Sequence, residues 1–384
     1  MAALARKTSR KRKRQRTEIS FAPGFHLPTP KQSRNAVGLS PIPKLFETGS
    51  ENVYFTKVPH PTCQDDWLAQ YNEAGQSFKN FVRTCPWISG RKVKFVVQNF
   101  IPEGRNLKER YPNGKIYIEP LGDFNQSSSD CSPCIDDLAD FTQRFYGLPV
   151  VILPVVSIKL PESKGGVVMC EKDLSVKAGA RKSSRVHLKQ LQLNYRWSQG
   201  TCHIQLKVDS IHALLRQHIP EDALCLIGLT MMDLFEDETD LFVAGLAAGN
   251  QRVAVFSFAR YNPCLSFSTE HWYQIWCSKE LDRLEKEKIL LQRSCKLLVH
   301  EIAHLMGLEH CIWFSCCMNG SGHLSEDFAQ PIYLCPVDLH KLQHLCGFDV
   351  VDRYRKLLEF FKKHNLTEEA QWCEARLLFV LDEV

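Results

Sequence analysis

Three histidines within residues 300–310, together with the glutamate that follows the first of them, have the spacing of a metal-binding site. His300 and His304 are four residues apart, so a helix would place both imidazoles on one face, about 40° apart. Glu301 lies one step further round that helix and could reach a water on the metal without binding the metal itself. Gly307 could adopt the positive φ that ends a helix and turns the chain back, which would bring His310 in as a third ligand. The segment therefore predicts a chelated metal ion with a carboxylate beside it.

The three candidate ligands favour zinc. Neutral imidazoles bind Zn²⁺ at about 2.0–2.1 Å, and catalytic zinc sites with three protein ligands keep a water in the fourth position. Zinc lowers the pKa of such a water to about 7 and polarises a carbonyl group. Glu301 would take the proton of the water and pass it to the leaving amine, which is amide hydrolysis without a covalent intermediate. The alternative, two core histidines and a surface glutamate on an ordinary helix, would bury polar rings that need partners.

A second group of possible metal ligands follows at once. Cys311, Cys316 and Cys317 are close in sequence, and Cys335 begins a Cys-Pro turn further on. This pattern is typical of a structural zinc site built from thiolates. Where a four-thiolate site would have a second cysteine three residues after Cys335, the chain has Asp338. The alternative is a set of reduced thiols without a metal.

The composition is that of a globular protein. The chain has 384 residues, of which 44% are hydrophobic and 24% charged, so it is neither collagen-like nor wholly disordered. The longest apolar stretch, residues 148–158, is too short to span a bilayer, and we expect no membrane association. Residues 1–5 are followed by charge rather than by the apolar core of a secretory signal. We therefore expect an intracellular protein, in the cytoplasm or the nucleus, whose 16 cysteines are mostly reduced.

The positive charge of the chain is confined to its beginning. Residues 1–16 carry eight basic side chains and no acidic one, whereas the net charge of the whole chain is only +5. The remainder is thus slightly acidic, which argues against nucleic-acid binding by the folded part of the chain. The basic block and the prolines after it predict a disordered tail over residues 1–55. That tail could be a nuclear-import or nucleic-acid patch, or merely a solvated segment.

Regular elements must carry the two candidate sites. Ile289, Leu290 and Leu297 support a helix over residues 286–299 that runs into the histidine motif. The hydrophobic patterns further predict helices at 65–83, 136–146 and 209–217, and strands at 115–120, 150–156, 191–197, 201–207, 223–230, 242–247 and 252–258.

The order of these elements indicates an α/β fold. The strand, helix and strand between residues 115 and 156 suggest a parallel pair with a crossover helix that ends at Gly147. Residues 191–207 and 242–258 each read as a possible hairpin. Residues 164–184 are rich in Lys, Gly and Ser, and we predict an inserted loop there.

The residues around both candidate sites match a known family. Residues 300–318, HEIAHLMGLEHCIWFSCCM, resemble the extended zinc-binding signature of the archaemetzincins, HExxHxxGxxHCx4CxM followed by CxxC. The resemblance extends to PEDALCLIGLTMMDLF at 220–235, VFSFARY at 255–261, NGSGHLSED at 319–327 and LCPVDLHKLQ at 334–343. It covers about residues 60–365 and is strongest to the eukaryotic type-two members.

The resemblance implies a fold and a division of the chain. It implies one metzincin-like zincin domain of the α/β (α+β) class, with a twisted mixed sheet, an active-site helix and a small C-terminal subdomain. We expect this metallopeptidase domain over residues 60–365, interrupted by the insert at 164–184. Residues 1–55 would be the disordered tail, and residues 366–384 would form a C-terminal helical extension.

The resemblance also implies roles for individual residues. The catalytic zinc would be held by His300, His304 and His310, with Glu301 as the general base. Met318 would be the methionine of the Met-turn beneath the histidines. A second, structural zinc would be held by Cys311, Cys316 and Cys335, with Asp338 at the position of the fourth family ligand, unless Cys317 or Cys346 substitutes for it.

These expectations combine into a zinc-dependent metallopeptidase that acts on peptides or proteins. The family suggests aminopeptidase character. In metzincins the substrate adds to an edge strand, for which residues 242–247 are the candidate. Two alternatives remain open: a catalytically weak zinc-binding scaffold for protein interactions, and a nuclear nucleic-acid-associated protein that acts through its basic tail. Retention of Glu301 argues against the scaffold, because a scaffold needs the histidines but not the base.

Overall fold

The computed structural model describes residues 19–49, 53–89, 101–124, 131–161, 167–173, 188–198, 203–263 and 281–382. The basic block at 1–16 and most of the predicted insert at 164–184 lie outside the described residues. Within the described ranges, no helix combines the length and the apolar character needed to cross a membrane.

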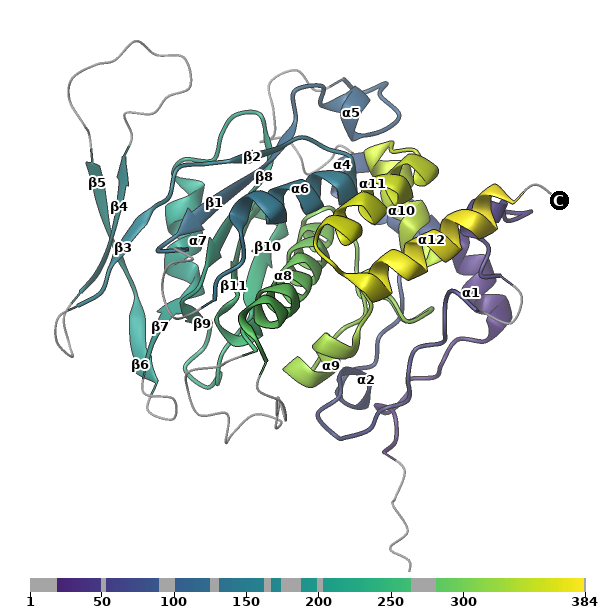
Figure 1. Cartoon of the computed structure of the whole chain (residues 1–384), viewed down its shortest axis with the longest axis horizontal. Coiled ribbons are helices and arrows are strands. Elements are labelled where there is room, and N and C mark those ends of the chain that lie inside the picture. Colours follow the sequence, from purple (N-terminus) through teal and green to yellow (C-terminus); the bar gives the residue numbers. More distant parts are fainter. Residues whose placement is uncertain are drawn as a thin grey trace, which may run out of the picture.

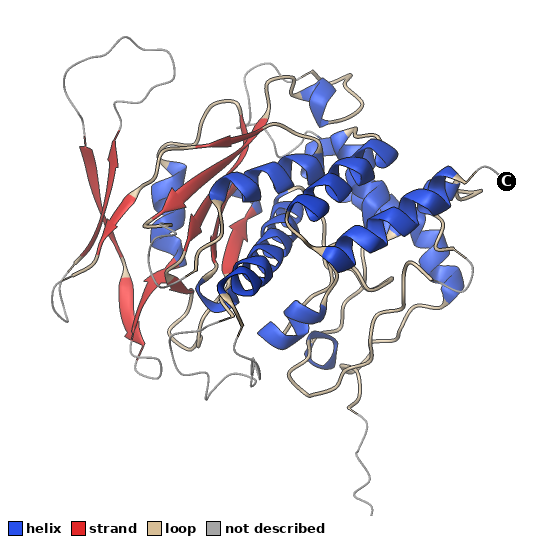
Figure 2. Cartoon of the chain, in the orientation of Figure 1, coloured by secondary structure: helices blue, strands red, loops and turns tan. Residues whose placement is uncertain are grey.

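A five-stranded mixed sheet forms the centre of the fold (Figures 1 and 2). In spatial order its strands are β10 (Gly245–Ala248), β11 (Val253–Ser257), β8 (Ala223–Thr230), β1 (Lys115–Leu121) and β2 (Val150–Ile152). The last four are mutually parallel, and β10 pairs antiparallel with β11 at the edge. The predicted α/β class, the mixed sheet and the hairpin of residues 242–258 are therefore confirmed.

The predicted parallel pair with a crossover helix is present as β1, α6 (Ile135–Tyr146) and β2. Gly147 ends α6 with φ 62°, as its position after the last apolar residue indicated. The second strand is shorter than the predicted 150–156 and ends at Ile152. Pro154 has no N–H to donate to the neighbouring strand, which accounts for the early end.

The two faces of the sheet pack against different layers. On β1, Ile116 and Ile118 belong to the larger core, while Tyr117 belongs to a second core on the opposite face. The larger core contains α6 and α8 (Arg283–Leu305), and the second contains α7 (Val208–Arg216). This alternation along β1 is the period of two expected of a strand that is covered on both sides.

Two small three-stranded sheets adjoin the second core. They are formed by β3 (Ser157–Lys159), β4 (Val168–Asp173) and β5 (Leu188–Leu193), and by β6 (Tyr195–Ser198), β7 (His203–Lys207) and β9 (Asp233–Phe235).

Two predictions need correction. The antiparallel partner of β7 is β6 alone, because residues 191–193 pair with β4 instead. Residues 168–173, predicted as loop, form a strand, since β5 supplies the backbone partners that the local composition does not reveal.

Helix α8 carries the histidine motif. The predicted helix over 286–299 is confirmed and extends from Arg283 to Leu305. Asp282 begins it through a capping box with Glu285, which satisfies two free N–H groups reciprocally. Because its apolar residues face the sheet and α6, the helix holds the motif at a fixed depth in the larger core.

The chain after α8 forms a helical layer that packs on α6 through α11 (Figure 1). Its helices are α9 (Leu324–Ala329), α10 (Pro336–Cys346), α11 (Val350–Lys363) and α12 (Thr367–Leu381). The last of these corresponds to the predicted helical extension at 366–384. It packs on α11 and buries Cys373 and Arg376, so its residues belong to the same helical layer.

The N-terminal residues differ from their predicted disorder. Residues 19–49 are described and include α1 (Pro30–Val37) and a 3₁₀ turn, η1 (Lys44–Phe46). Thr29 begins α1 with a capping box to Gln32, and α1 packs against α10. Phe25 and Phe46 are buried. The predicted disorder is therefore wrong for residues 19–49, because a helix cap and buried aromatic rings fix this segment despite its prolines. Of the predicted tail at 1–55, residues 1–18 and 50–52 lie outside the described residues.

The helix predicted over residues 65–83 is interrupted. It consists of α2 (Trp67–Gln70) and α3 (Phe78–Thr84), joined by an irregular stretch in which Gly75 has φ 72°. A side chain at Gly75 would also collide with Ile312. The remaining short helices of the described chain are α4 (Pro86–Ser89), α5 (Leu107–Arg110), η3 (Gly249–Gln251) and η4 (Ala259–Tyr261).

Candidate metal centre

The three histidines of the motif converge at the end of α8. The Nε2 atoms of His300 and His304 lie 3.0 Å apart. The ring of His310 is centred 4.9 Å from the ring of His304 and 5.6 Å from that of His300. One nitrogen from each ring lies within 4.8 Å of the others. The structure therefore brings together all three residues that the sequence predicts as ligands.

Each of the three rings is held through its Nδ1 atom. The acceptors are the carbonyl oxygen of Cys317 for His300 at 2.6 Å, that of Leu308 for His304 at 2.8 Å, and the Glu73 carboxylate for His310 at 3.0 Å. Carbonyl and carboxylate oxygens accept hydrogen bonds only, so Nδ1 carries the hydrogen and the Nε2 lone pair is left over. Metal-binding histidines have this arrangement, in which the second nitrogen fixes tautomer and orientation.

The protonation of the rings also suits a cation. Burial, with help from the neighbouring imidazoles, lowers the pKa of His300 far below its ordinary value. The same causes lower the pKa of His304 to about 4. Both rings are therefore neutral at pH 7, and their lone pairs are available. Three imidazole rings with available Nε2 lone pairs fit zinc, which binds neutral imidazole nitrogen.

Glu301 lies beside the histidines and is half-buried. Burial, followed by the nearby Asp327 charge, raises the pKa of its carboxyl group to about 8 in the metal-free chain. A bound cation would act in the opposite direction, because it favours the ionised form.

The turn that follows the motif supports the histidines from below. Gly307 has φ 90°, and a side chain there would lie 3.2 Å from the sulfur of Cys85. The predicted chain reversal at this glycine is thus confirmed. Met318 is buried, and its carbonyl oxygen accepts the N–H of Cys311 at 2.7 Å. Because Cys317 is the acceptor for His300, the turn at residues 317–318 connects the histidines to the cysteine cluster.

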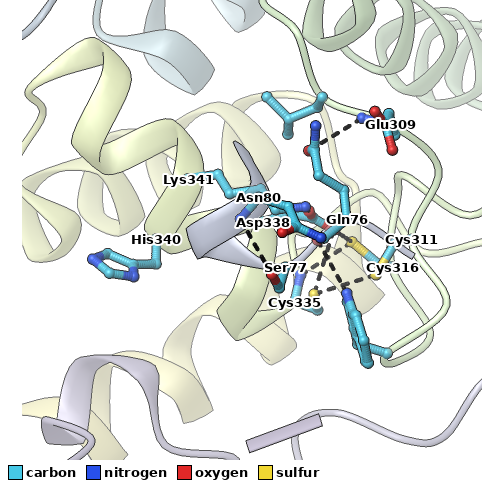
Figure 3. Close-up of polar contacts among 12 residues, drawn as sticks. Gln76, Ser77, Asn80, Glu309, Cys311, Cys316, Cys335, Asp338, His340 and Lys341 are labelled. Atoms are coloured by element: carbon cyan, nitrogen blue, oxygen red, sulfur yellow. Dashed lines mark hydrogen bonds and ion pairs between the residues drawn. The ribbon is translucent and has the colours of Figure 1, made fainter. Parts of the chain in front are cut away.

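The second predicted ligand set is also assembled (Figure 3). The sulfurs of Cys311 and Cys335 are 3.6 Å apart, and the Asp338 carboxylate lies 3.3 Å from the Cys316 sulfur and 3.5 Å from that of Cys335. All four side chains are buried. Such separations are those of four ligands around one zinc ion. The alternatives Cys317 and Cys346 do not belong to this group, so the geometry favours Asp338.

Lys341 is a buried neighbour of this cluster that sequence reasoning missed. Its Nζ atom donates to Asp338 Oδ1 at 2.8 Å, and neither side chain is exposed to solvent (0%). The Asp338 and Cys311 charges raise the pKa of the ammonium group, while burial and Cys311 raise that of Asp338 to about 7. With a zinc ion bound, three thiolates and a carboxylate would leave net negative charge for Lys341 to balance.

A cavity of about 240 Å³ opens beside His310. One wall comes from residues 58–73 and the other from residues 310–330. Trp67 places its ring edge-on to His310, with the ring centres 4.8 Å apart. Neither Trp67 nor Glu73 carries a local sequence signal of function, and only the tertiary structure places them at the histidines.

Cys63, Asp66 and His323 form a third compact group near this cavity. The Nδ1 atom of His323 accepts the N–H of Glu326 at 3.2 Å, which puts the ring hydrogen on Nε2. That hydrogen is directed at Asp66, whose Oδ1 lies 2.7 Å away. Because the Nε2 lone pair is used by the hydrogen, this group is a hydrogen-bonded anchor between the N-terminal segment and α9 rather than a ligand set.

Comparisons with known proteins place the chain in a family. The model of peptidase family M54 matches residues 260–344. The chain is 30% identical over 321 residues to archaemetzincin-2 of Rattus norvegicus, covering 79% of this chain and 74% of the relative. It is 35% identical over 314 residues to archaemetzincin-2 of Pongo abelii, covering 77% and 71%. Among solved structures, archaemetzincin from Methanopyrus kandleri aligns with a TM-score of 0.36 at 21% identity, over 63% of this chain and 97% of that one.

The chain belongs to the archaemetzincin family of zinc metallopeptidases. The predicted family and enzyme class are therefore confirmed, and membership implies peptide or protein substrates and zinc as the metal.

Proposed function

We propose that this metallopeptidase binds its catalytic zinc through His300, His304 and His310 and uses Glu301 as the general base. One observation carries the proposal. One nitrogen of each of the three rings lies within 4.8 Å of the others, while every Nδ1 atom is held by an acceptor. A core histidine needs one partner, but three rings prepared in the same way need a shared ligand.

The chemistry divides between the ion and the chain. Zinc supplies a Lewis acid that activates water and stabilises negative charge on the carbonyl oxygen. Glu301 accepts a proton from the attacking water and returns it to the amine that leaves. Glu301 suits this role because it follows His300 directly on the helix. Within the described part of the chain, its carboxylate has no hydrogen bond or ion pair.

We propose further that the substrate peptide lies along β10. This strand is the edge of the five-stranded sheet, is half-buried, and packs against α8. An edge strand offers unpaired backbone groups that bind a peptide with little regard to its side chains. The aminopeptidase character suggested by the family resemblance can be tested separately, with peptides that differ only in a free or an acetylated N-terminus.

We propose that Cys311, Cys316, Cys335 and Asp338 hold a second, structural zinc and that Met318 supports the histidines as the Met-turn residue. The cluster has no exposed member, which suits a closed structural site rather than a catalytic one. It is joined to the histidines through the turn at residues 317–318, because the Cys317 carbonyl oxygen accepts from His300 and the Met318 carbonyl oxygen accepts the N–H of Cys311. The second ion would therefore stiffen the turn that supports the catalytic site.

The test of the general base is the substitution Glu301→Gln, assayed on internally quenched peptides. The amide is nearly isosteric but cannot accept the proton, so we expect kcat to fall by about 10²–10⁴-fold. Zinc content and melting temperature should remain those of the wild type, because Glu301 is not assigned as a ligand.

The matched control is Glu287→Gln, which removes an exposed carboxylate from the same helix. We expect it to keep full activity, since its i,i+4 ion pair with Arg283 contributes little. Equal cleavage by wild type and Glu301→Gln, with zinc present in both, would refute the role assigned to Glu301, whereas absence of cleavage by both zinc-loaded proteins would favour a zinc-binding scaffold.

A further inference from the structure

Among the described residues, the carboxylate of Glu73 is the one charged group that holds a histidine of the motif. His300 and His304 donate to backbone carbonyl oxygens near in sequence, whereas His310 donates to a side chain 237 positions away. Glu73 does not belong to the group of ligand atoms within 4.8 Å of one another. It contacts His310 at Nδ1, the ring nitrogen that is not assigned to the metal.

The position of Glu73 is fixed by its own partner. Trp67 Nε1 donates to Glu73 Oε1 at 2.8 Å, and the same oxygen accepts from His310 Nδ1 at 3.0 Å. The edge of the Trp67 indole packs on the His310 ring. Trp67 is anchored in turn, because its backbone N–H donates to the Glu326 carboxylate at 2.8 Å. Glu73, Trp67 and His310 thus form one closed set of contacts.

The segment around Glu73 is tied to the loop that carries His310. Gln76 Nε2 donates to the carbonyl oxygen of Gly307 at 3.1 Å, and its Oε1 accepts the N–H of Glu309 at 3.4 Å (Figure 3). Trp313 Nε1 donates to the Gln76 carbonyl oxygen at 3.2 Å. These bonds hold the two segments together on both sides of His310, so the carboxylate cannot drift from the ring without breaking them.

We propose that Glu73 is a positioning residue for the catalytic zinc, which orients His310 and makes its Nε2 a stronger donor. The inference rests on the proposed function, in which His310 is a ligand. A carboxylate that accepts the Nδ1 hydrogen increases the electron density on the ring, an effect that a neutral carbonyl produces less strongly. The N-terminal segment is on this view part of the metal centre, although it lies outside residues 260–344 that match the family model.

The experiment compares Glu73→Gln and Glu73→Ala in the full-length protein. Both hydrogen bonds end on one oxygen, so a glutamine can place its carbonyl oxygen there and keep both donors. Glutamine thus removes the charge and retains the geometry, while alanine removes both. The matched control is Glu309→Gln, which removes an exposed carboxylate next to His310 whose side chain does not hold the ring.

Three quantities are measured on each variant: the dissociation constant for Zn²⁺ alone by competition with a chelator, the absorption spectrum after Co²⁺ substitution, and the melting temperature of the metal-free protein. A His304→Ala variant identifies which bound ion belongs to the histidines. We expect weaker zinc binding at that site, by about 10-fold for Glu73→Gln and up to about 100-fold for Glu73→Ala. The Co²⁺ bands should shift, and Glu309→Gln should match the wild type.

The outcomes separate the two proposals. Unchanged zinc affinity and Co²⁺ spectra in both Glu73 variants would overturn the positioning role while leaving the histidine site intact. A lower melting temperature of the metal-free Glu73→Gln protein with unchanged zinc affinity would also overturn it, because the residue would then be merely structural. If His304→Ala retains as much zinc as the wild type, the histidines hold no zinc, and the proposed function itself fails.

Discussion

The buried pair of Lys341 and Asp338 gives a prediction whose size follows from the structure. Two unit charges 2.8 Å apart attract each other by about 6 kcal/mol at an effective dielectric constant of 20. Most of that attraction offsets the desolvation of two fully buried groups. Removal of one partner leaves the other charge buried alone, which costs about 3–5 kcal/mol. We therefore expect Asp338→Asn to destabilise the metal-free protein by about 4 kcal/mol at about pH 8.5, where the Asp338 carboxyl group, whose pKa is raised to about 7, is ionised.

The double variant Asp338→Asn with Lys341→Met provides the comparison. It removes both charges and replaces the ammonium with an apolar side chain of similar length, so most of the stability should return. For a chain of 384 residues the entropy of unfolding is about 0.8 kcal/mol/K. A loss of about 4 kcal/mol thus lowers the melting temperature by about 5 °C.

The assay is thermal unfolding followed by circular dichroism in the presence of a chelator, so that loss of a metal ligand does not contribute. The single variant should melt about 5 °C below the wild type, and the double variant should lie close to the wild type. If the double variant melts as low as the single one, the buried ammonium is not the source of the loss, and the charge argument is wrong.

Two further predictions concern the metal sites and their turn. Metal analysis of the purified protein should give two zinc ions per chain, and one in each of the variants His304→Ala and Cys316→Ser. If either variant retains both ions, the zinc site assigned to the substituted residue is wrong. Gly307→Ala should destabilise the protein by about 1–3 kcal/mol, because φ 90° strains any side chain and the new carbon would press on Cys85. Denaturant unfolding against a Gly249→Ala control, where a side chain meets open space, measures the difference.

The motif and its helix were predictable because their signals are local. His300 and His304 share a helix face because they are four residues apart. Gly307 is the type of residue that most readily adopts the left-handed conformation at the end of a helix. The strand over residues 223–230 was equally clear, since a continuous apolar run buried on both faces has few other interpretations. In each case the residues that decide the structure are neighbours in the sequence.

The contacts that complete the site could not be predicted in this way. Glu73 lies in an irregular stretch between two short helices, and its partner His310 is far away in sequence. No local pattern distinguishes Lys341 from an exposed lysine on a helix. It is buried because of the way α10 packs. The disorder predicted for residues 1–55 is wrong over residues 19–49, because the order of that segment depends on contacts distant in sequence, such as the packing of Phe46 on His340 of α10.

The hydrogen bond between Glu73 and His310 also imposes an order in time on the growing chain. The glutamate leaves the ribosome 237 residues before the histidine. At about 5–20 residues per second, this separation corresponds to roughly 10–50 s of synthesis. During that interval the N-terminal segment has no histidine to hold. A nascent chain would thus complete the support of its third zinc ligand only after both distant segments have been made.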